Sequence, residues 1–348
     1  MKPRVLEFLN KEVEHKHIPG AVIHVSYKRE VIMHEAIGKR VVYPKSEAMK
    51  LDTIFDLASL TKVVATLPAI LKLIDGGFMS LHDPISNFIP EFSRNGKDRV
   101  TVKHLLTHTS GLPSHKQYYI EGLNKEQIYE RIYQQELEVP MGKKVIYSDL
   151  GLIVLYNLIE RITGETFERF SKREIFDPLD MTETCFNPRF AKDRFAATEY
   201  SEKLTDYKHG IVHDENTESM GGISGHAGLF SSVRDIANFA EMVENNGIFR
   251  GRRILSGPSL EIARLNYTEF DVEGRGLGWQ LKGKGRAACG DLFSEDSYGH
   301  TGFTGTSIWF DPTVKLHVIL LTNRVHFGRN EEILRIRPRL HNLIRASL

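Results

Sequence analysis

The sequence predicts an α+β fold in which an antiparallel sheet is flanked by helices and carries a helical insertion domain. Strand-like runs occur near both ends of the chain, while the middle shows the three- and four-residue spacing of helices. Runs from both ends can share one sheet only if the chain between them forms a block of its own. We therefore expect a discontinuous sheet domain from residues 1–82 and 205–348, and a helical domain from residues 83–204.

Composition narrows the class of protein. The chain has 348 residues, enough for a large core or two domains. Its 46 Lys and Arg against 45 Asp and Glu give a net charge of +1 without long runs of one sign, so we expect no nucleic-acid partner. Cys185 and Cys289 lie far apart and are expected to be free thiols. No stretch is long enough for a transmembrane segment, and the first residues do not resemble a signal peptide. A cytoplasmic protein is expected, unless an export signal precedes this sequence.

The N-terminal third contains a helix, a hairpin and a second helix. Residues 4–16 have an amphipathic pattern, and residues 21–27 and 31–38 are β-like runs joined by a charged turn. Apolar residues then recur at helical spacing from Val63 to Ile74. Pro68 interrupts this second helix and should kink it, and Gly76-Gly77 should end it.

The rest of the chain changes from helical to strand-like. Apolar residues recur at helical spacing over 102–106, 128–137 and 150–162. A glycine-rich loop over 221–232 ends at Ser232, which should cap a helix reaching about residue 245, with Asp235 three residues on. Two strands over 306–310 and 316–322, and a last helix from about residue 330, complete the expected fold.

Ser59 and Lys62 form the first candidate for catalysis. They are three residues apart at the first turn of the predicted second helix, so they share one face. An amine one turn away can take the proton of a serine hydroxyl, and the helix N-terminus favours negative charge nearby. This is the S-x-x-K arrangement of acylating serine hydrolases. The alternative is an N-cap serine followed by a solvated lysine.

Two further motifs give the pair its context. Tyr147-Ser148-Asp149 lies just before a predicted helix, and the stretch 298–303, Tyr-Gly-His-Thr-Gly-Phe, lies just before a predicted strand. With Ser59 to Lys62 they resemble, in order and spacing, the active-site motifs of the serine β-lactamase and penicillin-binding-protein superfamily. The resemblance is greatest to its class C β-lactamase-like branch, which includes esterases, D-aminopeptidases and amidases. Stretches over 59–92, 100–113, 173–184, 276–279 and 299–323 also resemble that branch, so the likeness covers nearly the whole chain.

The resemblance implies an acyl-enzyme mechanism without a cofactor, at a site between the two domains. Ser59 would attack a carbonyl, and Lys62 and Tyr147 would share the proton transfer. The N–H groups of Ser59 and Phe303 would form the oxyanion hole. The triplet His300, Thr301 and Gly302 would line the opposite wall. To act as a base near pH 7, a lysine must have its pKa lowered from about 10.4 to near 7, which corresponds to a free-energy difference of roughly 4–5 kcal/mol. Burial against an apolar helix face can supply this difference.

Two residues depart from the family pattern. Asp149 stands where the second motif usually ends in Asn, and an ionised carboxylate beside Lys62 favours the ammonium form. This shifts the burden of proton transfer towards Tyr147, unless Asp149 is protonated or aimed at substrate. His300 stands where β-lactamases usually have Lys, and a histidine is largely neutral near pH 7. Binding of an anionic β-lactam should therefore be weaker than in β-lactamases. A histidine at this position of the third motif resembles the pattern of the D-aminopeptidase and amidase members of the family.

Other candidate residues have simpler interpretations. His104 and His108 are four apart but lack an intervening Glu and a third ligand, so we expect packing or loop hydrogen bonds and no metal. His226, and His213 with Asp214, either contact substrate from their loops or stabilise those loops. The stretch 274–278 lacks the last glycine of a dinucleotide-binding loop, and the stretch 222–226 lacks the last glycine of a nucleophile elbow, so neither motif is expected.

The sequence therefore favours a serine hydrolase acting on an amide or ester, with a small-molecule or peptidoglycan-fragment substrate, such as a D-amino-acid compound, implied by the resemblance alone. The alternative is a catalytically impaired penicillin-binding or sensing protein on the same fold, which the departures at Asp149 and His300 favour. The sequence does not fix the oligomeric state.

Overall fold

A single antiparallel sheet organises the molecule. The computed structural model describes residues 1–283 and 287–348, and within them seven strands pair in the order β11-β12-β13-β14-β1-β2-β3. Their bounds are Gln280–Leu281 (β11), Tyr298–Thr301 (β12), Ser307–Asp311 (β13), Leu316–Thr322 (β14), Gly20–Tyr27 (β1), Glu30–Val41 (β2) and Glu47–Ala48 (β3). Strands from the two ends of the chain are neighbours, because β1 pairs with β14. The predicted α+β class with an antiparallel sheet is confirmed.

The predicted N-terminal hairpin is also confirmed. Strands β1 and β2 pair antiparallel, with His24 opposite His34. Lys28 and Arg29 form the exposed turn with φ of 51° and 70°. Two positive φ values in succession are typical of a type I′ turn, whose twist matches that of the strands. The turn therefore uses two long basic residues where glycine or asparagine is commoner.

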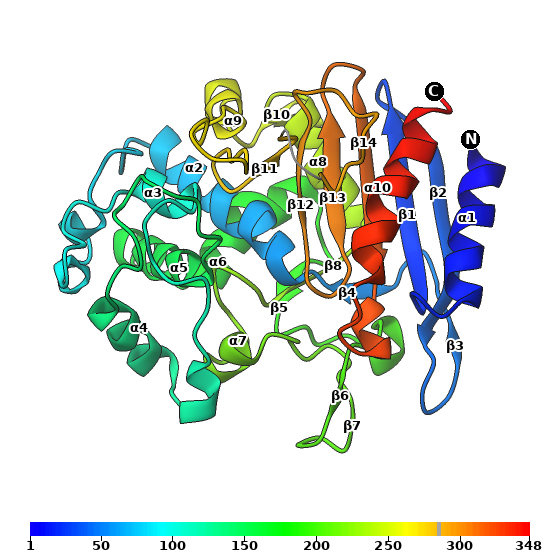
Figure 1. Cartoon of the computed structure of the whole chain (residues 1–348), viewed down its shortest axis with the longest axis horizontal. Helices are drawn as coiled ribbons and strands as arrows, with labels where there is room; N and C mark the ends of the chain where they lie inside the picture. Colours follow the sequence, from blue (N-terminus) through cyan, green and yellow to red (C-terminus); the bar gives the residue numbers. More distant parts are fainter. Residues whose placement is uncertain (284–286) are drawn as a thin grey trace.

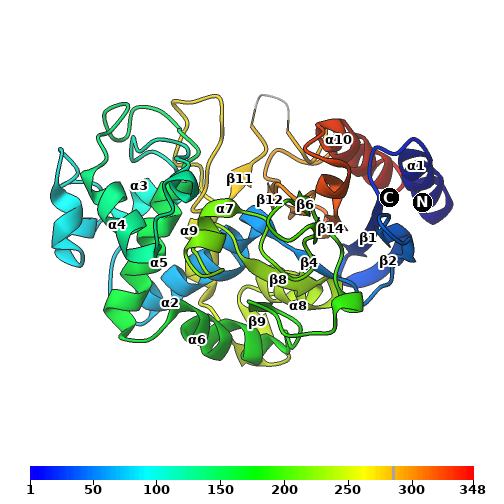
Figure 2. The same cartoon turned by 90° about the horizontal axis from the view of Figure 1, so that it is seen from below.

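Helices cover both faces of the sheet. Helices α1 (Lys2–Glu14) and α10 (Glu332–Arg345) lie side by side on one face, where they bury Ile23, Val25 and Trp309 (Figure 1). Helix α8 (Val233–Glu244) packs on the opposite face, against β1 and β14 (Figure 2). The alternation of side chains along a strand gives each face its own apolar set.

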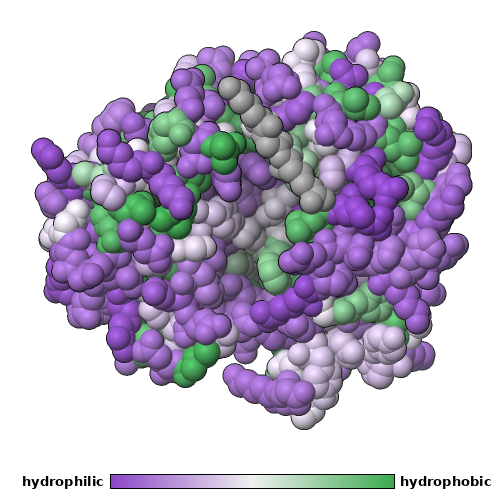
Figure 3. Space-filling view, in the orientation of Figure 1, coloured by the Kyte–Doolittle hydropathy of each residue, from purple (hydrophilic) through white to green (hydrophobic). Residues whose placement is uncertain are grey.

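The middle of the chain forms a helical side next to the sheet. Helices α3 (Val102–Leu106), α4 (Lys125–Gln134) and α5 (Asp149–Thr163) gather there (Figures 1 and 2). Helix α5 is almost wholly buried and ends at Gly164, which has φ of 67°. The space-filling view is mostly hydrophilic and is hollowed near its centre, between the helical side and the sheet side (Figure 3).

Short elements connect these parts. Three short helices are α6 (Phe167–Ser171), α7 (Glu215–Ser219) and α9 (Gly257–Ala263). A π turn covers Lys172–Phe176, and 3-10 turns occur at Ile85–Asn87, Pro90–Ser93, Tyr118–Glu121, Asp177–Leu179, Lys192–Arg194 and Arg324–Phe327. A small sheet pairs β4 (Ile54–Asp56), β8 (Leu229–Ser232) and β5 (Cys185–Phe186), and two-stranded ladders form from β6 (Tyr200–Ser201) with β7 (Asp206–Tyr207) and from β9 (Ile248–Phe249) with β10 (Arg252–Arg253). In the described residues no helix combines the length and apolar character needed to cross a membrane.

The segment that carries Ser59 differs from the continuous helix predicted for it. It begins as a 3-10 turn over Ala58–Leu60, continues as a π turn over Lys62–Thr66, and becomes regular only in α2 (Leu67–Asp75). Pro68 explains part of this, because it cannot donate to the preceding turn and its ring crowds that turn. The helix ends as predicted, with Gly77 at φ of 72°.

Other boundaries shift by a few residues. Helix α1 covers Lys2–Glu14 instead of residues 4–16, since Pro3 suits a first helical turn. Helix α4 covers Lys125–Gln134 instead of residues 128–137, because Asn124 caps it. The third motif was expected before a strand, but Tyr298–Thr301 is itself strand β12, paired with β13.

Candidate active site

Ser59 and Lys62 are in contact at the centre of the site. The Lys62 Nζ donates to Ser59 Oγ over 2.8 Å, to the His226 carbonyl over 3.1 Å, and pairs with Asp149 Oδ1 at 2.8 Å. Two hydrogen-bond acceptors and one carboxylate therefore surround the Lys62 amino group. Lys62 is fully buried, whereas Ser59 is partly exposed. The resting site thus contains a reachable serine hydroxyl beside a charged lysine.

Asp149 sets the charge state of Lys62. Burial alone would lower the pKa of the lysine, but the Asp149 carboxylate, with a smaller contribution from Tyr147, outweighs it and raises that pKa above its ordinary value. Burial alone would likewise raise the pKa of Asp149, but Lys62, His226 and His115 stabilise the carboxylate, and its pKa falls well below its usual range. The pair is therefore an ion pair at neutral pH, as the sequence departure at Asp149 suggested.

A strained turn presents the serine. Ala58 has φ of 46°, a left-handed conformation that costs a non-glycine residue about 1–2 kcal/mol. The buried Asp56 carboxylate accepts from the Ala58 N–H over 2.8 Å and from the His213 N–H over 2.6 Å, and Thr61 Oγ1 donates to the Ala58 carbonyl over 2.7 Å. These bonds hold the turn, so Ser59 is fixed before substrate arrives.

The second motif is fixed to the loop after α3. Ser148, the N-cap of α5, donates through its Oγ to the Pro113 carbonyl over 2.6 Å, and its N–H donates to His108 Nδ1 over 3.1 Å. The Asp149 N–H donates to the Ser114 carbonyl over 2.9 Å. Burial holds the pKa of His108 well below its ordinary value, so the ring stays neutral and can accept.

Tyr147 lies among aromatic and cationic side chains. Its ring centroid is 4.5 Å from that of His108 and 5.9 Å from that of His300. The Lys62 Nζ is 5.0 Å from the ring centroid, and the Arg275 guanidinium carbon is 5.2 Å from it. Both distances fall within the range of cation–π contacts, which hold the ring beside Lys62.

The third motif faces the same centre from β12. His300 is buried, and its Nδ1 donates to the Thr301 carbonyl over 2.9 Å. Burial, with Lys62 and Arg275 nearby, lowers the pKa of His300 to about 3, so the ring is neutral near pH 7. Its Nε2 is buried without a hydrogen-bond partner in the part of the chain that the structure describes. Thr301 beside it is partly exposed.

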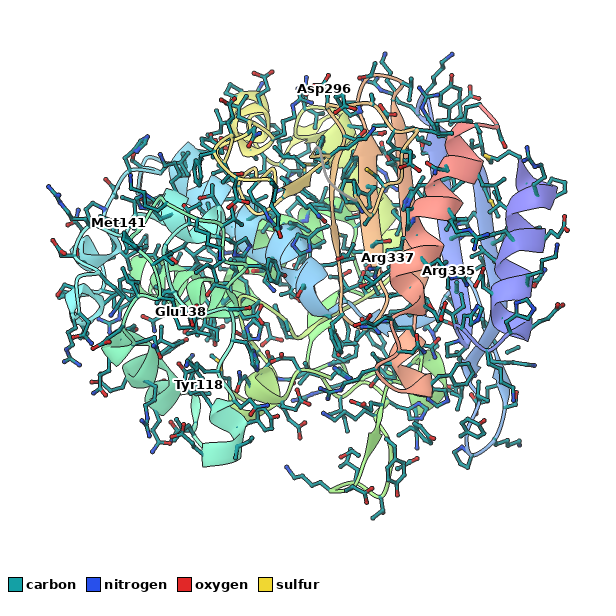
Figure 4. The ribbon with its side chains drawn as sticks, viewed as in Figure 1. Tyr118, Glu138, Met141, Asp296, Arg335 and Arg337 are labelled. Carbon is teal, nitrogen blue, oxygen red and sulfur yellow. The ribbon has the colours of Figure 1, made fainter. Side chains whose placement is uncertain are left out.

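Gly302 lets the chain pass close to the serine turn. A Cβ at this position would lie 2.5 Å from the Leu57 carbonyl oxygen and 2.1 Å from Thr306 Oγ1. The buried Arg337 on α10 donates to the carbonyls of Gly302 over 3.0 Å and of Thr306 over 2.8 Å. Figure 4 labels Arg337 on the side of α10 next to the sheet and Arg335 on the side next to α1. A buried guanidinium therefore braces the loop that follows β12.

Phe303 follows this braced loop. Neither its N–H nor that of Ser59 donates to a protein acceptor among residues 1–283 and 287–348. The Phe303 side chain is 46 % exposed, and Arg324 and Arg329 lie over its ring at 4.7 and 5.8 Å. An oxyanion hole requires two free N–H groups directed at one point, so the roles of these two groups stay a prediction.

His226 enters the site through its backbone. Its carbonyl accepts from Lys62, while its ring is 1 % exposed and contacts Ser224, Thr217 and Asp214 at 2.9 to 3.3 Å. The ring of His213 is also buried, with Nε2 3.0 Å from Glu199. Both histidine rings thus take part in loop hydrogen bonds, and the His213 ring also lies 5.6 Å from that of Phe303 and lines a neighbouring cavity, so contact of either residue with substrate stays a prediction.

His104 and His108 have separate roles. His104 completes the capping box of α3 with Thr101, while His108 accepts from Ser148. Within the described ranges, no group of three or more His, Cys, Asp or Glu side chains is arranged to hold a metal ion.

Sequence reasoning missed two side chains of this site. His115 Nδ1 lies 3.5 Å from Asp149 Oδ2, and the side chain is 38 % exposed. Arg275 is buried beside Tyr147 and pairs with Glu273 over 2.7 Å. His115 lies two residues after the family-like stretch 100–113, and Arg275 directly precedes the stretch 276–279. Their closeness in sequence to these stretches was the signal that could have identified them.

Comparisons with known proteins identify the family and the fold of this chain. The family model described as Beta-lactamase matches residues 7–342. An N-acetylmuramyl-L-alanine amidase from Bacillus subtilis is 32 % identical and covers 88 % of this chain and 78 % of its own length. Among solved structures, EstCE1, a hydrolase with promiscuous acyltransferase activity, has a TM-score of 0.77 at 21 % identity, covering 98 % of each chain. The octameric penicillin-binding protein homologue from Pyrococcus abyssi has a TM-score of 0.77 at 24 % identity, covering 99 % of this chain and 77 % of its own.

A serine hydroxyl bonded to a buried lysine, with a tyrosine beside them, defines the class of serine hydrolases that work through an acyl-enzyme. The chain belongs to the β-lactamase family, the group of β-lactamase-related and penicillin-binding-type enzymes that the sequence resembled.

Proposed function

We propose that this enzyme forms an acyl-enzyme at Ser59 and hydrolyses an amide of a peptidoglycan-derived or D-amino-acid compound. The observation that carries the proposal is the 2.8 Å hydrogen bond between Lys62 Nζ and Ser59 Oγ at the base of a partly exposed site. The roles assigned to the individual residues below belong to the same proposal.

In the acylation step the Ser59 Oγ–H proton passes to Lys62 or Tyr147, and Oγ bonds to the substrate carbonyl carbon. The N–H groups of Ser59 and Phe303 stabilise the oxyanion. When the C–N bond breaks, the transferred proton goes to the leaving nitrogen. Water then attacks the serine ester by the reverse sequence of proton transfers, which releases the acid and restores Ser59.

Lys62 must lose its proton before it can act as a base. The Asp149 carboxylate opposes this, because it raises the pKa of the lysine. Tyr147 therefore shares the proton transfer, as its ring adjoins Lys62. The unpartnered Nε2 of the neutral His300 supports a role as acceptor for a hydroxyl or N–H group of the reacting complex.

Several features support a polar substrate in place of a β-lactam. His300 carries no charge near pH 7, and Arg275 is compensated by Glu273, so neither of these two described residues offers an uncompensated cation to hold a β-lactam carboxylate. A cavity of about 420 Å³ adjoins Phe303, lined by side chains that include Tyr119, Glu215 and Arg329. Charged and polar lining suits the carboxylates and amines of a peptidoglycan fragment. Thr301 and Gly302 would line the path of this substrate.

The proposal includes the domain arrangement expected from the sequence. Ser59 and Lys62 come from the part made of residues 1–82 and 205–348, and Tyr147 and Asp149 come from residues 83–204. A substrate held between them would touch both parts. The compartment, expected to be the cytoplasm, is part of the proposal as well.

Hydrolysis of a defined panel tests the substrate class. N-acetylmuramyl-L-alanine, an N-acyl-D-alanyl-D-alanine and its L,L counterpart would be incubated with wild type, Ser59→Ala and the exposed control Ser114→Ala. We expect the wild type and the control to release free amine from one of the first two, at least tenfold faster than from the L,L compound. Preferred turnover of the L,L peptide, or equal turnover by Ser59→Ala, would contradict the proposal.

A second candidate is a slowly acylating binding or sensing protein on the same fold. The Asp149–Lys62 ion pair favours it, because a lysine held as an ammonium is a poor base. Stoichiometric labelling of Ser59 without turnover, relieved by Asp149→Asn, would support this candidate over the hydrolase.

A further inference from the structure

We propose that His115 is a positioning residue for the reaction. When protonated, His115 interacts with the Asp149 carboxylate and weakens the attraction between that carboxylate and the Lys62 ammonium. The inference rests on the proposed function in one respect, namely that Lys62 accepts the Ser59 proton.

The geometry joins four groups in a row. Ser59 Oγ lies 2.8 Å from Lys62 Nζ, which lies 2.8 Å from Asp149 Oδ1. The other oxygen of the same carboxylate, Oδ2, lies 3.5 Å from His115 Nδ1. The two cationic groups therefore hold opposite oxygens of one carboxylate. Each one weakens the attraction that the carboxylate exerts on the other.

The charges allow two arrangements with the same number of protons. In one, Lys62 is an ammonium and His115 is neutral. In the other, Lys62 is a free amine and His115 is an imidazolium, and Asp149 is ionised in both. The second arrangement is the one that can accept the Ser59 proton. Burial favours it on the lysine side, since Lys62 is fully buried while the His115 side chain is 38 % exposed.

The surroundings of His115 favour its protonated form. The contact with the Asp149 carboxylate is the main cause that raises the pKa of His115, against the opposing effect of burial. Asp214, at the N-cap of α7, and Glu215 in α7 add to the rise. These acidic groups and Asp149 at the start of α5 are the charges that act on the ring, with Lys62 beyond the carboxylate.

The backbone keeps His115 in place. The Ser114 carbonyl accepts from the Asp149 N–H over 2.9 Å, so the residue before His115 is tied to the residue that His115 contacts. The partial exposure of the ring gives it access to protons from solvent. A neutral amide in its place would keep similar bulk but could not take up a proton.

The expected effect of His115→Gln appears in the pH profile of acylation. Without the imidazolium, Asp149 holds the Lys62 ammonium more firmly, so acylation by the variant should be slower at pH values where the wild-type His115 is protonated, by about one order of magnitude after solvent screening. At pH 7 acylation should be about tenfold slower. Because His115 must be protonated to act, the ratio of the wild-type rate to the variant rate should fall as pH rises, and the two rates should become equal where the wild-type His115 is neutral.

A double-mutant cycle with Asp149→Asn tests the route of the effect. Acylation by a small activated ester would be followed in stopped flow from pH 5 to 10 for wild type, both single variants and the double variant. His82→Gln, an exposed histidine in the loop after α2, is the matched control and should behave as wild type. In the Asp149→Asn background, His115→Gln should change the rate less than twofold at every pH.

The outcomes separate this inference from the proposed function. A loss of rate in His115→Gln that is equal at all pH values, or that persists in the Asp149→Asn background, would indicate a structural role and overturn the inference. No change in His115→Gln would overturn it as well. Failure of the proposed function would instead appear as ester turnover that survives Ser59→Ala.

Discussion

Replacing Asp149 by Asn should make acylation faster at neutral pH. The substitution keeps an oxygen that can accept from Lys62 but removes the charge that stabilises the ammonium. Burial of Lys62, which lowers its pKa, would then act unopposed by a carboxylate. More of the enzyme would contain the free amine that can accept the Ser59 proton.

The size of the effect follows from the 2.8 Å separation between Lys62 Nζ and Asp149 Oδ1. Coulomb's law at an effective dielectric of 20 gives about 6 kcal/mol for unit charges at this distance, which is an upper limit. The Asp149 side chain is 20 % exposed and its charge is spread over two oxygens, so we take about 2 to 3 kcal/mol. At 1.36 kcal/mol per unit, the pKa of Lys62 should fall by about two units.

The assay is the burst of product from a small activated ester, measured across pH for wild type, Asp149→Asn and the exposed control Asp98→Asn. The rate for Asp149→Asn at pH 7 should exceed that of the wild type by roughly 30- to 100-fold, and the control should match the wild type. A rate below wild type at every pH would refute the reasoning, since it would mean that the carboxylate takes part in the reaction.

Three further predictions concern the support of the site and the fold. Gly302→Ala would place a Cβ 2.5 Å from the Leu57 carbonyl oxygen, so we expect a loss of about 1–3 kcal/mol in thermal unfolding and at least tenfold slower acylation; wild-type values for both would contradict the close approach. Arg337→Met would remove the guanidinium donor from two loop carbonyls that each keep one backbone donor, and it should cost about 1.5–3 kcal/mol in urea unfolding, whereas a cost below about 0.5 kcal/mol would contradict the brace. Burial lowers the pKa of His24 to about 3, so as pH falls the histidine is protonated in the unfolded chain before it is protonated in the folded protein. The neutral His24 therefore contributes to the free energy of unfolding fully above about pH 6.5, and this contribution is lost towards pH 3. From pH 7 to pH 5 the loss should be about 2 kcal/mol, and His24→Gln should reduce it by that amount; an equal loss in both proteins would exclude His24 as the cause.

The sequence was most informative where structure depends on local pattern. The period of apolar residues predicted α5 and the strands β1 and β14, and the glycines at 77 and 164 ended helices as expected. Local pattern did not predict the 3-10 and π turns that carry Ser59. These turns depend on Asp56, which bonds both to Ala58 nearby and to His213 far along the chain.

The electrostatic state of the site was predictable only in part. The departure at Asp149 pointed to a charged lysine unless the carboxyl is protonated, and the 2.8 Å contact between the two side chains is consistent with the first of these states, which stays a prediction. The contact between His115 and Asp149 joins residues 34 positions apart, and Arg337 reaches Gly302 from the last helix. Such contacts depend on how whole elements pack, which periodicity and motif spacing do not specify.

The most direct test of the account is the intact mass of the protein over time after mixing with a small activated ester and, separately, with a penicillin. For the wild type we predict an acyl adduct from the ester that forms and then decays, located on the peptide that contains Ser59, and little or no adduct from the penicillin. Ser59→Ala should show neither adduct while keeping its fold by circular dichroism. An adduct of unchanged yield on folded Ser59→Ala would contradict the central claim that Ser59 is the nucleophile.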